Sequence, residues 1–334
     1  MPVFNCGEWL AEAITSIRAQ SFMNFELIII DDGSADQSNS IIAAAMRDDD
    51  RIRMIWQDHL GITAALNRGL ALSRAKIIAR MDGDDIAAPD RLRVQLAFLD
   101  SRPEVGAVGS WAHVINEHGK KLKELRPETN PEALARLLPR QNPFVHSSMM
   151  FLADSVRSMG GYRTLLEGAE DYDLWLRIAE RAQVANVAEF LVTYRRHSKS
   201  ASAKTVHKRL LSARLARLSA TARRGLRPDF IESLEMPLNL DALQDHAELR
   251  ITAKCYGLLM GPTTARCEVK DLIILLRANI NHAERKAAQL WLMDLLRNHK
   301  SYKLRVAALF LILVLHPPRG LSLVWSIFQS RISS

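Results

Sequence analysis

Cysteine is scarce in this chain of 334 residues, and two long segments near its end contain no acidic residue. The three cysteines, Cys6, Cys255 and Cys267, are odd in number and widely spaced. This excludes a disulfide scaffold and a cysteine-based metal site, and it is typical of a reducing compartment. Residues 204–228 hold eight Lys or Arg and residues 295–334 hold six, without one Asp or Glu in either segment. Such cationic segments favour an anionic partner, either nucleic acid or an anionic membrane surface.

A long apolar run is also missing. The longest, Val306–Leu315, has ten residues, whereas a helix needs about 20 to span a bilayer. It predicts a buried helix or one that lies in a membrane interface, as does the apolar stretch 321–328. Residues 1–5, MPVFN, lack the basic and apolar regions of a signal peptide. We therefore expect a cytoplasmic protein, with a peripheral position on the cytoplasmic face of the cell membrane as a further hypothesis.

Apolar runs alternate with helical patterns through the first hundred residues. Strands are predicted at 25–30, 51–56 and 76–81, and helices at 9–20, 36–46, 62–70 and 89–100. This alternation predicts an α/β fold with a mostly parallel central sheet flanked by helices. Further strands are predicted at 105–115, 144–152 and 184–194 with a helix at 171–182, and from residue 203 the pattern is almost entirely helical. We predict one domain at 1–203 and a basic helical region at 204–334.

Two acidic clusters follow predicted strands directly. Asp82, Asp84 and Asp85 lie in the tetrad DGDD, and Asp31 and Asp32 open the tetrad DDGS. Crowded carboxylates repel unless a cation or a protein base neutralises them, and Mg²⁺ is commonly bound by carboxylates together with substrate phosphates. The first cluster therefore indicates a metal that holds a diphosphate, and the second could accept hydrogen bonds from a nucleobase or ribose. An acidic turn before a helix and an ordinary Asp-Gly turn are the structural alternatives.

Three other places carry candidate chemistry. Asn67 and Arg68 lie near the end of a predicted helix, where a solvated arginine is the simpler interpretation. Asp171 opens the predicted helix EDYDLWLR, where it could be a general base for an attacking hydroxyl or an acid that the helix dipole favours. His197 follows the last predicted strand in YRRHSKS and could contact a metal or diphosphate, with a surface basic cluster as the alternative.

Taken in order and spacing, these motifs resemble family 2 of the inverting glycosyltransferases, the GT-A type that uses nucleotide-diphospho sugars. The resemblance covers about residues 1–200 and rests on MPVFN at 1–5, DDGS at 31–34, GITAALNRG at 61–69, DGDD at 82–85, GGYR at 160–163, EDYDLWLR at 170–177 and YRRHSKS at 194–200. It implies a GT-A-like sheet, Mn²⁺ or Mg²⁺ as cofactor, and inverting transfer of a sugar from a UDP-, GDP- or dTDP-linked donor. The acceptor would be a saccharide or a lipid-linked molecule in the assembly of bacterial surface polysaccharide or glycolipid.

The resemblance also implies roles for individual positions. The segment Pro2, Val3 and Phe4 would line the nucleobase, with Phe4 where the family usually has a stacking Tyr, and Asp32 would contact the base beside Asp31. Asp82 and Asp84 match the Asp-x-Asp pair, with Asp84 as the direct metal ligand and Asp85 near the ribose or donor sugar. Asn67 and Arg68 fall in the donor-binding segment, His197 near the metal or diphosphate, and Asp171 at the catalytic base.

One departure and several alternatives remain at this point. Relatives usually begin several residues earlier, with an apolar strand leading into the MPVFN-like motif, whereas Met1 already lies inside it. An incomplete first strand predicts lower stability or weak donor affinity. A nucleic-acid binder would leave the ordered carboxylates unexplained, and no aromatic stacking set accompanies the basic stripe. A nucleotidyltransferase would open with a glycine-rich, Arg-bearing loop that Asn5–Glu8 is not. A non-catalytic transferase-like binding subunit is the remaining alternative.

Overall fold

The computed structural model describes residues 1–198 and 206–234, together with the single positions 292 and 308. The chain forms two compact units, the first from Met1–Val206 and Ser212–Phe230, the second from His207–Leu211 and Ile231–Ser334. The domain boundary near residue 203 stays a prediction, and the apolar runs at 306–315 and 321–328 lie, apart from Ala308, outside the described residues. Among the described helices, none is both long enough and apolar enough to cross a bilayer.

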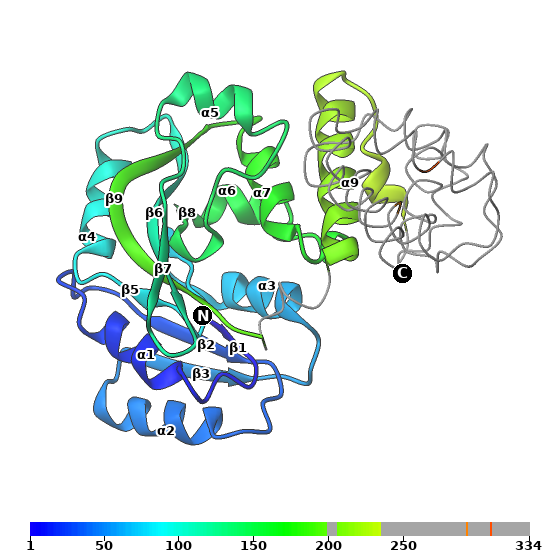
Figure 1. The fold of residues 1–334 in the computed structure, drawn as a ribbon. Coiled ribbons are helices and arrows are strands. Elements are labelled where there is room, and N and C mark those ends of the chain that lie inside the picture. The colour runs from blue at the N-terminus through cyan, green and yellow to red at the C-terminus, as the bar shows by residue number, and fades with distance from the viewer. Residues whose placement is uncertain (199–205, 235–291, 293–307, 309–334) are drawn as a thin grey trace, which may run out of the picture. The chain divides into compact units, whose positions relative to one another are not determined.

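Strands and helices follow the predicted alternation through the first hundred residues (Figure 1). The strands are β1 (Pro2–Val3), β2 (Leu27–Asp31), β3 (Ile52–Trp56), β4 (Ile77–Ala79), β5 (Ile86–Ala87), β6 (Val105–Asn116), β7 (Lys121–Leu125), β8 (Met150–Leu152) and β9 (Gln183–Arg196). The α-helices are α1 (Leu10–Arg18), α2 (Ser38–Asp48), α3 (Ile62–Leu72), α4 (Arg91–Asp100), α5 (Pro131–Leu137), α6 (Ala153–Ser158), α7 (Glu170–Ile178) and α9 (Val206–Arg224). Short 3₁₀ turns cover His146–Ser148, Thr164–Leu166 and Phe230–Ser233.

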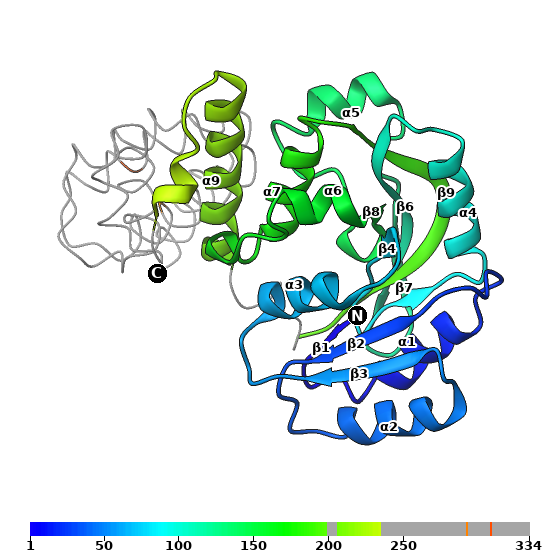
Figure 2. The same cartoon turned by 180° about the vertical axis from the view of Figure 1, so that it is seen from behind.

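The first sheet is parallel, in the order β1-β2-β3. All five residues of β2 are buried, because helices cover both faces of the sheet. Ile29 packs with α1 and α2, whereas Ile28 and Ile30 pack with Ala65 of α3. Figures 1 and 2 show α3 on the opposite face of this sheet from α2. The α/β class with a helix-flanked sheet is confirmed.

The second sheet is mixed rather than parallel. Its order is β4-β8-β6-β9-β5, with β7 paired to β6 as a hairpin. Only β6 and β9 run parallel in it, while β4–β8, β6–β8, β5–β9 and β6–β7 are antiparallel. The prediction of a mostly parallel sheet therefore holds for the first sheet alone, because an apolar run shows that a strand is buried but not the direction of its partner.

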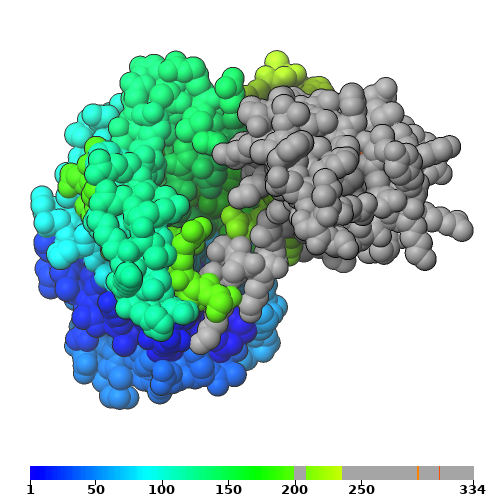
Figure 3. Space-filling model, viewed as in Figure 1, coloured from blue at the N-terminus to red at the C-terminus, as the bar shows by residue number. Residues whose placement is uncertain are grey.

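Helices on its two faces hold the second sheet in place. Leu92 and Leu99 of α4 pack on β6, β8 and β9, and Trp175 of α7 is fully buried against Phe144 and Phe151. In the space-filling view, the green surface of β6, β7 and the following residues lies beside the blue surface of the N-terminal residues (Figure 3). The carboxyl ends of β2 and β4, which carry the two acidic clusters, belong to the two different sheets.

Candidate active site

The turn after β4 brings three carboxylates together. Ligand oxygens of Asp82, Asp84 and Asp85 all lie within 4.8 Å of one another. Asp85 is fully buried and accepts a hydrogen bond of 2.7 Å from the Arg195 backbone N–H. Burial, followed by the charges of Asp84 and Asp82, raises the pKa of Asp85 well above its usual value. Asp82 and Asp84 stay partly exposed, so these two face the open side of the turn.

Arg80, the second residue before Asp82, neutralises it. The guanidinium is only 4% exposed and holds both carboxylate oxygens of Asp82, one of them at 2.7 Å. Ser147 Oγ donates to the same carboxylate at 3.0 Å. Despite the desolvation that opposes it, the charge of Asp82 raises the pKa of Arg80. Asp82 is therefore an oriented, charge-paired group, and Asp84 is the carboxylate of this cluster with more freedom to take a ligand.

His197 lies beside Asp84, and its contact with a metal or a diphosphate stays a prediction. Its Nε2 is 2.8 Å from Asp84 Oδ2, and its ring packs on Trp9 with centroids 4.0 Å apart. Arg195, two residues earlier, is buried, donates to the Asp84 carbonyl oxygen at 3.0 Å and pairs with Glu12. The end of β9 is thus bound to the acidic turn through both backbone and side chains.

A second group of residues surrounds Asp32 at the end of β2. Phe4, 43% exposed, stacks on His59 with ring centroids 4.0 Å apart, while Pro2 and Val3 are buried. The Asp32 carboxylate accepts hydrogen bonds from Gln57 and from the backbone N–H groups of Leu60 and Gly61, and His59 Nδ1 lies 3.0 Å from it. Asp31 is fully buried and accepts from the Ser34 N–H. Through these hydrogen bonds the Asp32 carboxylate holds the 57–61 loop in place. Its contact with a nucleobase stays a prediction.

The predicted base, Asp171, lies at the start of α7. Its Oδ2 accepts a hydrogen bond of 2.8 Å from Asn142 Nδ2, and its Oδ1 accepts one from the Tyr172 backbone N–H at 2.7 Å. The neighbouring Glu170 is buried, and burial together with the charge of Asp171 raises the pKa of Glu170 to about 7. Both carboxylates are held by hydrogen bonds, since Glu170 accepts from the Gly168 N–H, and Asp171 is the less buried of the pair.

Tyr162 connects the two halves of the site. Its backbone exchanges two hydrogen bonds of 2.8 Å with the Asn67 side chain. Gly161 makes this approach possible, since it has a φ of +71° and an added Cβ would lie 2.5 Å from Asn67 Oδ1. Burial raises the pKa of the Tyr162 hydroxyl, Arg80 opposes that rise, and Asp171, Glu170 and Asp82 add to it. The charges of the acidic turn and of the start of α7 thus both raise the pKa of one side chain, although the two segments are far apart in sequence.

The 3₁₀ turn at 146–148 contacts both Asp82 and Tyr162. Ser147 binds Asp82, and His146 Nε2 lies 3.3 Å from the Tyr162 hydroxyl. Burial, helped by the charge of Arg80, lowers the pKa of His146 well below its usual value, so the imidazole is neutral. Arg68, by contrast, is exposed on α3, in keeping with the solvated interpretation of that residue.

Sequence reasoning missed the residues that orient the site. Arg80, His59 and Asn142 each contact a predicted residue, but none belongs to a motif of clustered carboxylates, whereas Tyr162 lies in the GGYR motif already noted. An arginine inside an apolar run was the signal available for Arg80, because an unpaired charge is rarely buried. Nothing local marks Asn142, whose partner is 29 positions away.

Comparison with known proteins identifies the chain. A family model described as glycosyl transferase family 2 matches residues 1–158. The O-antigen biosynthesis glycosyltransferase WbnJ of Escherichia coli is 33% identical over 204 residues, which are 60% of this chain and 79% of that protein. The chain belongs to glycosyltransferase family 2.

Two further relatives of this family-2 glycosyltransferase span similar regions. The putative glycosyltransferase EpsE of Bacillus subtilis is 37% identical over 54% of this chain and 65% of its own length. The amylovoran biosynthesis glycosyltransferase AmsE of Erwinia amylovora is 33% identical over 56% of this chain and 71% of its own. The match to EpsE thus covers slightly less than two thirds of that protein.

Solved structures support the GT-A fold of this family-2 member. TarS of S. aureus in complex with UDP-GlcNAc aligns with a TM-score of 0.53 and 13% identity, covering 86% of each chain. The mannosyltransferase PcManGT of Pyrobaculum calidifontis, in complex with GDP-Man and Mn²⁺, aligns with a TM-score of 0.51 and 17% identity over 93% of this chain and 83% of that one. At these identities the likeness concerns the fold alone.

Proposed function

We propose that this chain transfers a sugar from a nucleotide-diphospho donor to an acceptor hydroxyl, with inversion, at the site between the acidic turn and α7. The observation that carries the proposal is the arrangement around Tyr162. The charges of Asp82, paired with Arg80, and of Asp171, held by Asn142, both act on the buried Tyr162 hydroxyl, and Asp82 belongs to the acidic turn with Asp84. Diphosphate binding needs positive charge, and hydroxyl attack needs a base, so this combination suits glycosyl transfer.

The residues of the acidic turn fit a hard divalent cation. Carboxylate oxygens within 4.8 Å of one another are the ligand type that Mg²⁺ or Mn²⁺ takes. Asp84 and His197 would hold it, because Asp82 is paired with Arg80 and Asp85 is buried. When bound, the cation supplies positive charge that offsets the charge growing on the departing nucleoside diphosphate.

The remaining steps belong to the protein's own residues. Phe4 and His59 offer a stacked aromatic surface for the nucleobase at the end of β1. Asp171, held by Asn142, accepts the proton of the acceptor hydroxyl as its oxygen attacks the anomeric carbon. Attack from the face opposite the leaving diphosphate inverts that carbon. Glu170 beside it is buried with a raised pKa, so below pH 7 it adds little competing negative charge.

The relatives suggest a pathway for this chemistry. WbnJ and AmsE are named for O-antigen and amylovoran biosynthesis, which supports assembly of a bacterial surface polysaccharide or glycolipid on a saccharide or lipid-linked acceptor. A peripheral membrane position would suit such an acceptor, and the two segments without acids support it. Arg223 of α9, however, is already paired with Glu180 and Asp229. Flotation with anionic vesicles tests this location, and a protein that stays with the unbound fraction contradicts it.

A donor panel tests the function. The protein is incubated with UDP-, GDP- and dTDP-sugars and Mn²⁺, and release of nucleoside diphosphate is measured with and without EDTA. We expect release from one nucleotide class, and loss of that release in EDTA. An Asp84→Asn variant should lose Mn²⁺-dependent nucleotide binding in calorimetry, whereas Asp100→Asn, on an exposed end of α4, should keep it. Undiminished transfer in EDTA would reject the cation, and no release from any donor would reject the function.

A further inference from the structure

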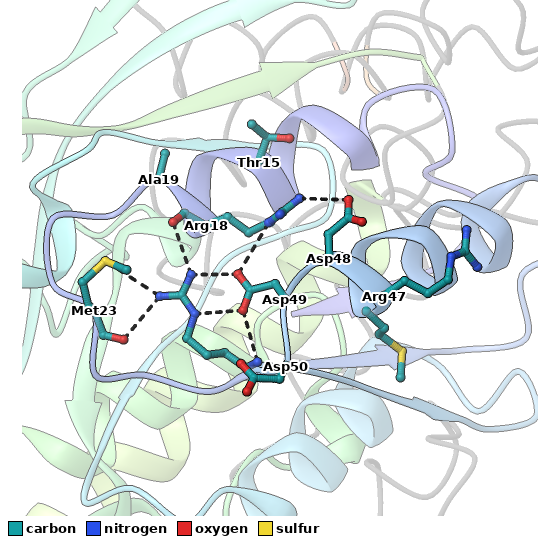
Figure 4. A pocket seen from close by; sticks show the side chains of 10 residues that line it. Thr15, Arg18, Ala19, Met23, Arg47, Asp48, Asp49 and Asp50 are labelled. Atoms are coloured by element: carbon teal, nitrogen blue, oxygen red, sulfur yellow. Dashed lines mark hydrogen bonds and ion pairs between the residues drawn. The ribbon is translucent and has the colours of Figure 1, made fainter.

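A hollow of about 810 Å³ lies between α1 and the α2–β3 turn (Figure 4). Arg18 and Arg51 line it, but both already pair with Asp49, whose pKa is lowered to about 2 chiefly by its hydrogen bonds to Arg51. Because these charges neutralise one another, the hollow carries no argument for a ligand. A polar atom that its surroundings hold in place, and that makes no hydrogen bond with the protein, is a stronger indication of one.

His146 carries such an atom, and it lies on a segment that contacts both carboxylates of the proposed mechanism. Ser147, the next residue, donates to the Asp82 carboxylate, and Asn142, four residues earlier, donates to Asp171. In an inverting transfer the anomeric carbon lies between the leaving diphosphate and the attacking hydroxyl. A donor with its diphosphate at the acidic turn and its anomeric carbon toward Asp171 therefore places its sugar beside this segment.

The Tyr162 hydroxyl determines which ring nitrogen of His146 carries the hydrogen. Tyr162 is only 3% exposed, and its hydroxyl lies 3.3 Å from His146 Nε2 and has no other hydrogen-bond partner among the described residues. Burial raises the pKa of this hydroxyl, so it stays protonated at neutral pH. A buried hydroxyl hydrogen without an acceptor is costly, so the hydroxyl donates to Nε2. A neutral imidazole that accepts at Nε2 carries its own hydrogen at Nδ1.

The neutral state of the imidazole indicates what kind of atom it binds. Burial, helped by the charge of Arg80, lowers the pKa of His146 well below its usual value. A second proton on the ring would add positive charge near Arg80 and would take away the acceptor of the Tyr162 hydroxyl. Oxyanions such as diphosphate form their strongest hydrogen bonds with charged donors, whereas a neutral N–H suits a neutral oxygen. The chemistry of His146 therefore favours the sugar over the diphosphate.

The Nδ1–H group of His146 is available to a ligand. His146 is half-buried, and its Nδ1 makes no hydrogen bond with the described residues and is not one of their fully enclosed polar atoms without a partner. Aromatic contacts hold the ring, since its centroid lies 5.9 Å from the buried Trp175 in an edge contact and 5.7 Å from Tyr162. A donor group oriented in advance loses little conformational entropy when it binds.

We propose that His146 binds the donor sugar, with its Nδ1–H donating a hydrogen bond to a neutral oxygen of that sugar, a hydroxyl or an amide carbonyl. Tyr162 is the positioning residue, because its hydroxyl holds the imidazole in the form that donates at Nδ1. The inference rests on the proposed function, since it takes the sugar to lie between the acidic turn and Asp171. It assigns His146 to the sugar and not to the nucleotide, so the two parts of the donor can be tested separately.

Two variants separate the two ring nitrogens of His146. In His146→Gln the amide reaches the Nε2 position, so it can still accept from Tyr162, but no N–H remains at the Nδ1 position. In His146→Asn the amide keeps a donor at the Nδ1 position, whereas the Tyr162 hydroxyl loses its acceptor. Calorimetry with Mn²⁺ measures the affinity for the active donor of the panel and for its nucleoside diphosphate, and urea denaturation measures stability. His118→Gln, at a side chain that is 79% exposed, is the control.

We expect His146→Gln to bind the donor about tenfold more weakly than the wild type and the nucleoside diphosphate equally well. We expect His146→Asn to keep its donor affinity within about threefold and to unfold at a lower urea concentration than His146→Gln. The control should match the wild type throughout. Unchanged donor affinity in His146→Gln would overturn the proposal, and so would an equal loss of affinity for donor and nucleoside diphosphate.

The position of the ring hydrogen can be measured without any donor. In protein with ¹⁵N-labelled histidine, long-range correlations between ring nitrogens and ring carbon-bound hydrogens identify the nitrogen that carries a hydrogen. We expect His146 to carry it on Nδ1 at neutral pH and Tyr162→Phe to shift it toward Nε2. A hydrogen on Nε2 in the wild type would overturn the assignment of His146 alone, whereas a wild type that binds no donor would reject the proposed function and this inference with it.

Discussion

Asn142 Nδ2 donates a hydrogen bond of 2.8 Å to Asp171 Oδ2, and this bond sets the direction in which the carboxylate faces. The second oxygen of Asp171 is occupied by the Tyr172 backbone N–H. Asn142 also accepts from the Phe144 N–H, so its own amide is fixed by the chain that follows it. If Asp171 is the base, as proposed, a carboxylate held in this way needs little reorganisation when the acceptor hydroxyl arrives.

Replacing Asn142 with Ala should therefore lower kcat while sparing donor binding. We expect a decrease of about tenfold, the equivalent of about 1.4 kcal/mol, because one hydrogen bond to the carboxylate is lost. Steady-state kinetics with the active donor measures it, and the donor KM should stay within about twofold. The exposed neighbour Gln141→Ala is the control. A rise in donor KM with unchanged kcat would contradict a role for Asn142 in orienting the base.

The Arg80–Asp82 pair predicts a loss of stability that a second mutation repairs. Arg80→Met leaves Asp82 and Ser147 without the buried cation that holds them, so we expect a decrease of about 3 kcal/mol in the free energy of unfolding. The double variant Arg80→Met/Asp82→Asn should recover much of that loss, because no unpaired charge remains. Urea denaturation measures both, with the exposed Arg68→Met as control. Additive losses in the double variant would show that the two residues do not interact.

Glu170 predicts a pH dependence with a definite sign. Its pKa rises from 4.5 to about 7 in the folded protein, chiefly through burial and then through Asp171. Between these pH values the folded state holds a proton that the unfolded chain has released, so the free energy of unfolding falls as pH rises from about 4.5 to 7. The contribution of Glu170 is fully present only below pH 4.5. Denaturation of the wild type across this range should show the decrease.

Glu170→Gln should remove the part of this decrease in the free energy of unfolding that Glu170 supplies. That part is at most about 1.4 kcal/mol per pH unit. Glu189→Gln, at an exposed position of β9, should leave the slope unchanged. If wild type and Glu170→Gln have parallel stability profiles between pH 4.5 and 7, the raised pKa of Glu170 is wrong.

Much of the fold could be predicted because its signals are local. Leu10, Ile14 and Ile17 recur at helical spacing and form the buried face of α1. The run that ends at Asp31 is apolar throughout because β2 is covered on both faces. Apart from the two-residue strands β1 and β5, these patterns identified the elements of the first hundred residues within a few positions.

Other elements carry no such signal. β7 is a hairpin arm with exposed Lys and Leu side chains, and β5 has two residues, so neither makes an apolar run. Residues 144–152 have the composition of one strand, but Ser148 binds the Val145 carbonyl oxygen and turns the chain, so β8 begins only at Met150. The backbone N–H groups of Ser148 and Met149 also bond back to Val145 and His146, so side-chain and backbone hydrogen bonds together form the turn.

The residues of the candidate site also fall into two groups, those with a local signal in the sequence and those without one. The clustered carboxylates at 82–85 can be recognised in the sequence, because crowded like charges repel one another unless a cation or a protein base neutralises them. The residues that neutralise and orient them come from distant segments, as Ser147 does for Asp82. Which segments meet is set by the order and direction of the strands, and that information is not local.

Transfer and binding measured side by side for Asp171→Asn test the central claim most directly. The active donor from the panel is supplied with acceptor and Mn²⁺, product formation is followed over time, and donor affinity is measured by calorimetry on the same preparation. We expect transfer to fall by at least about 10²-fold, the usual contribution of a general base, with donor affinity unchanged. Full transfer by Asp171→Asn, or a wild-type protein that binds the donor and never transfers it, would contradict the account.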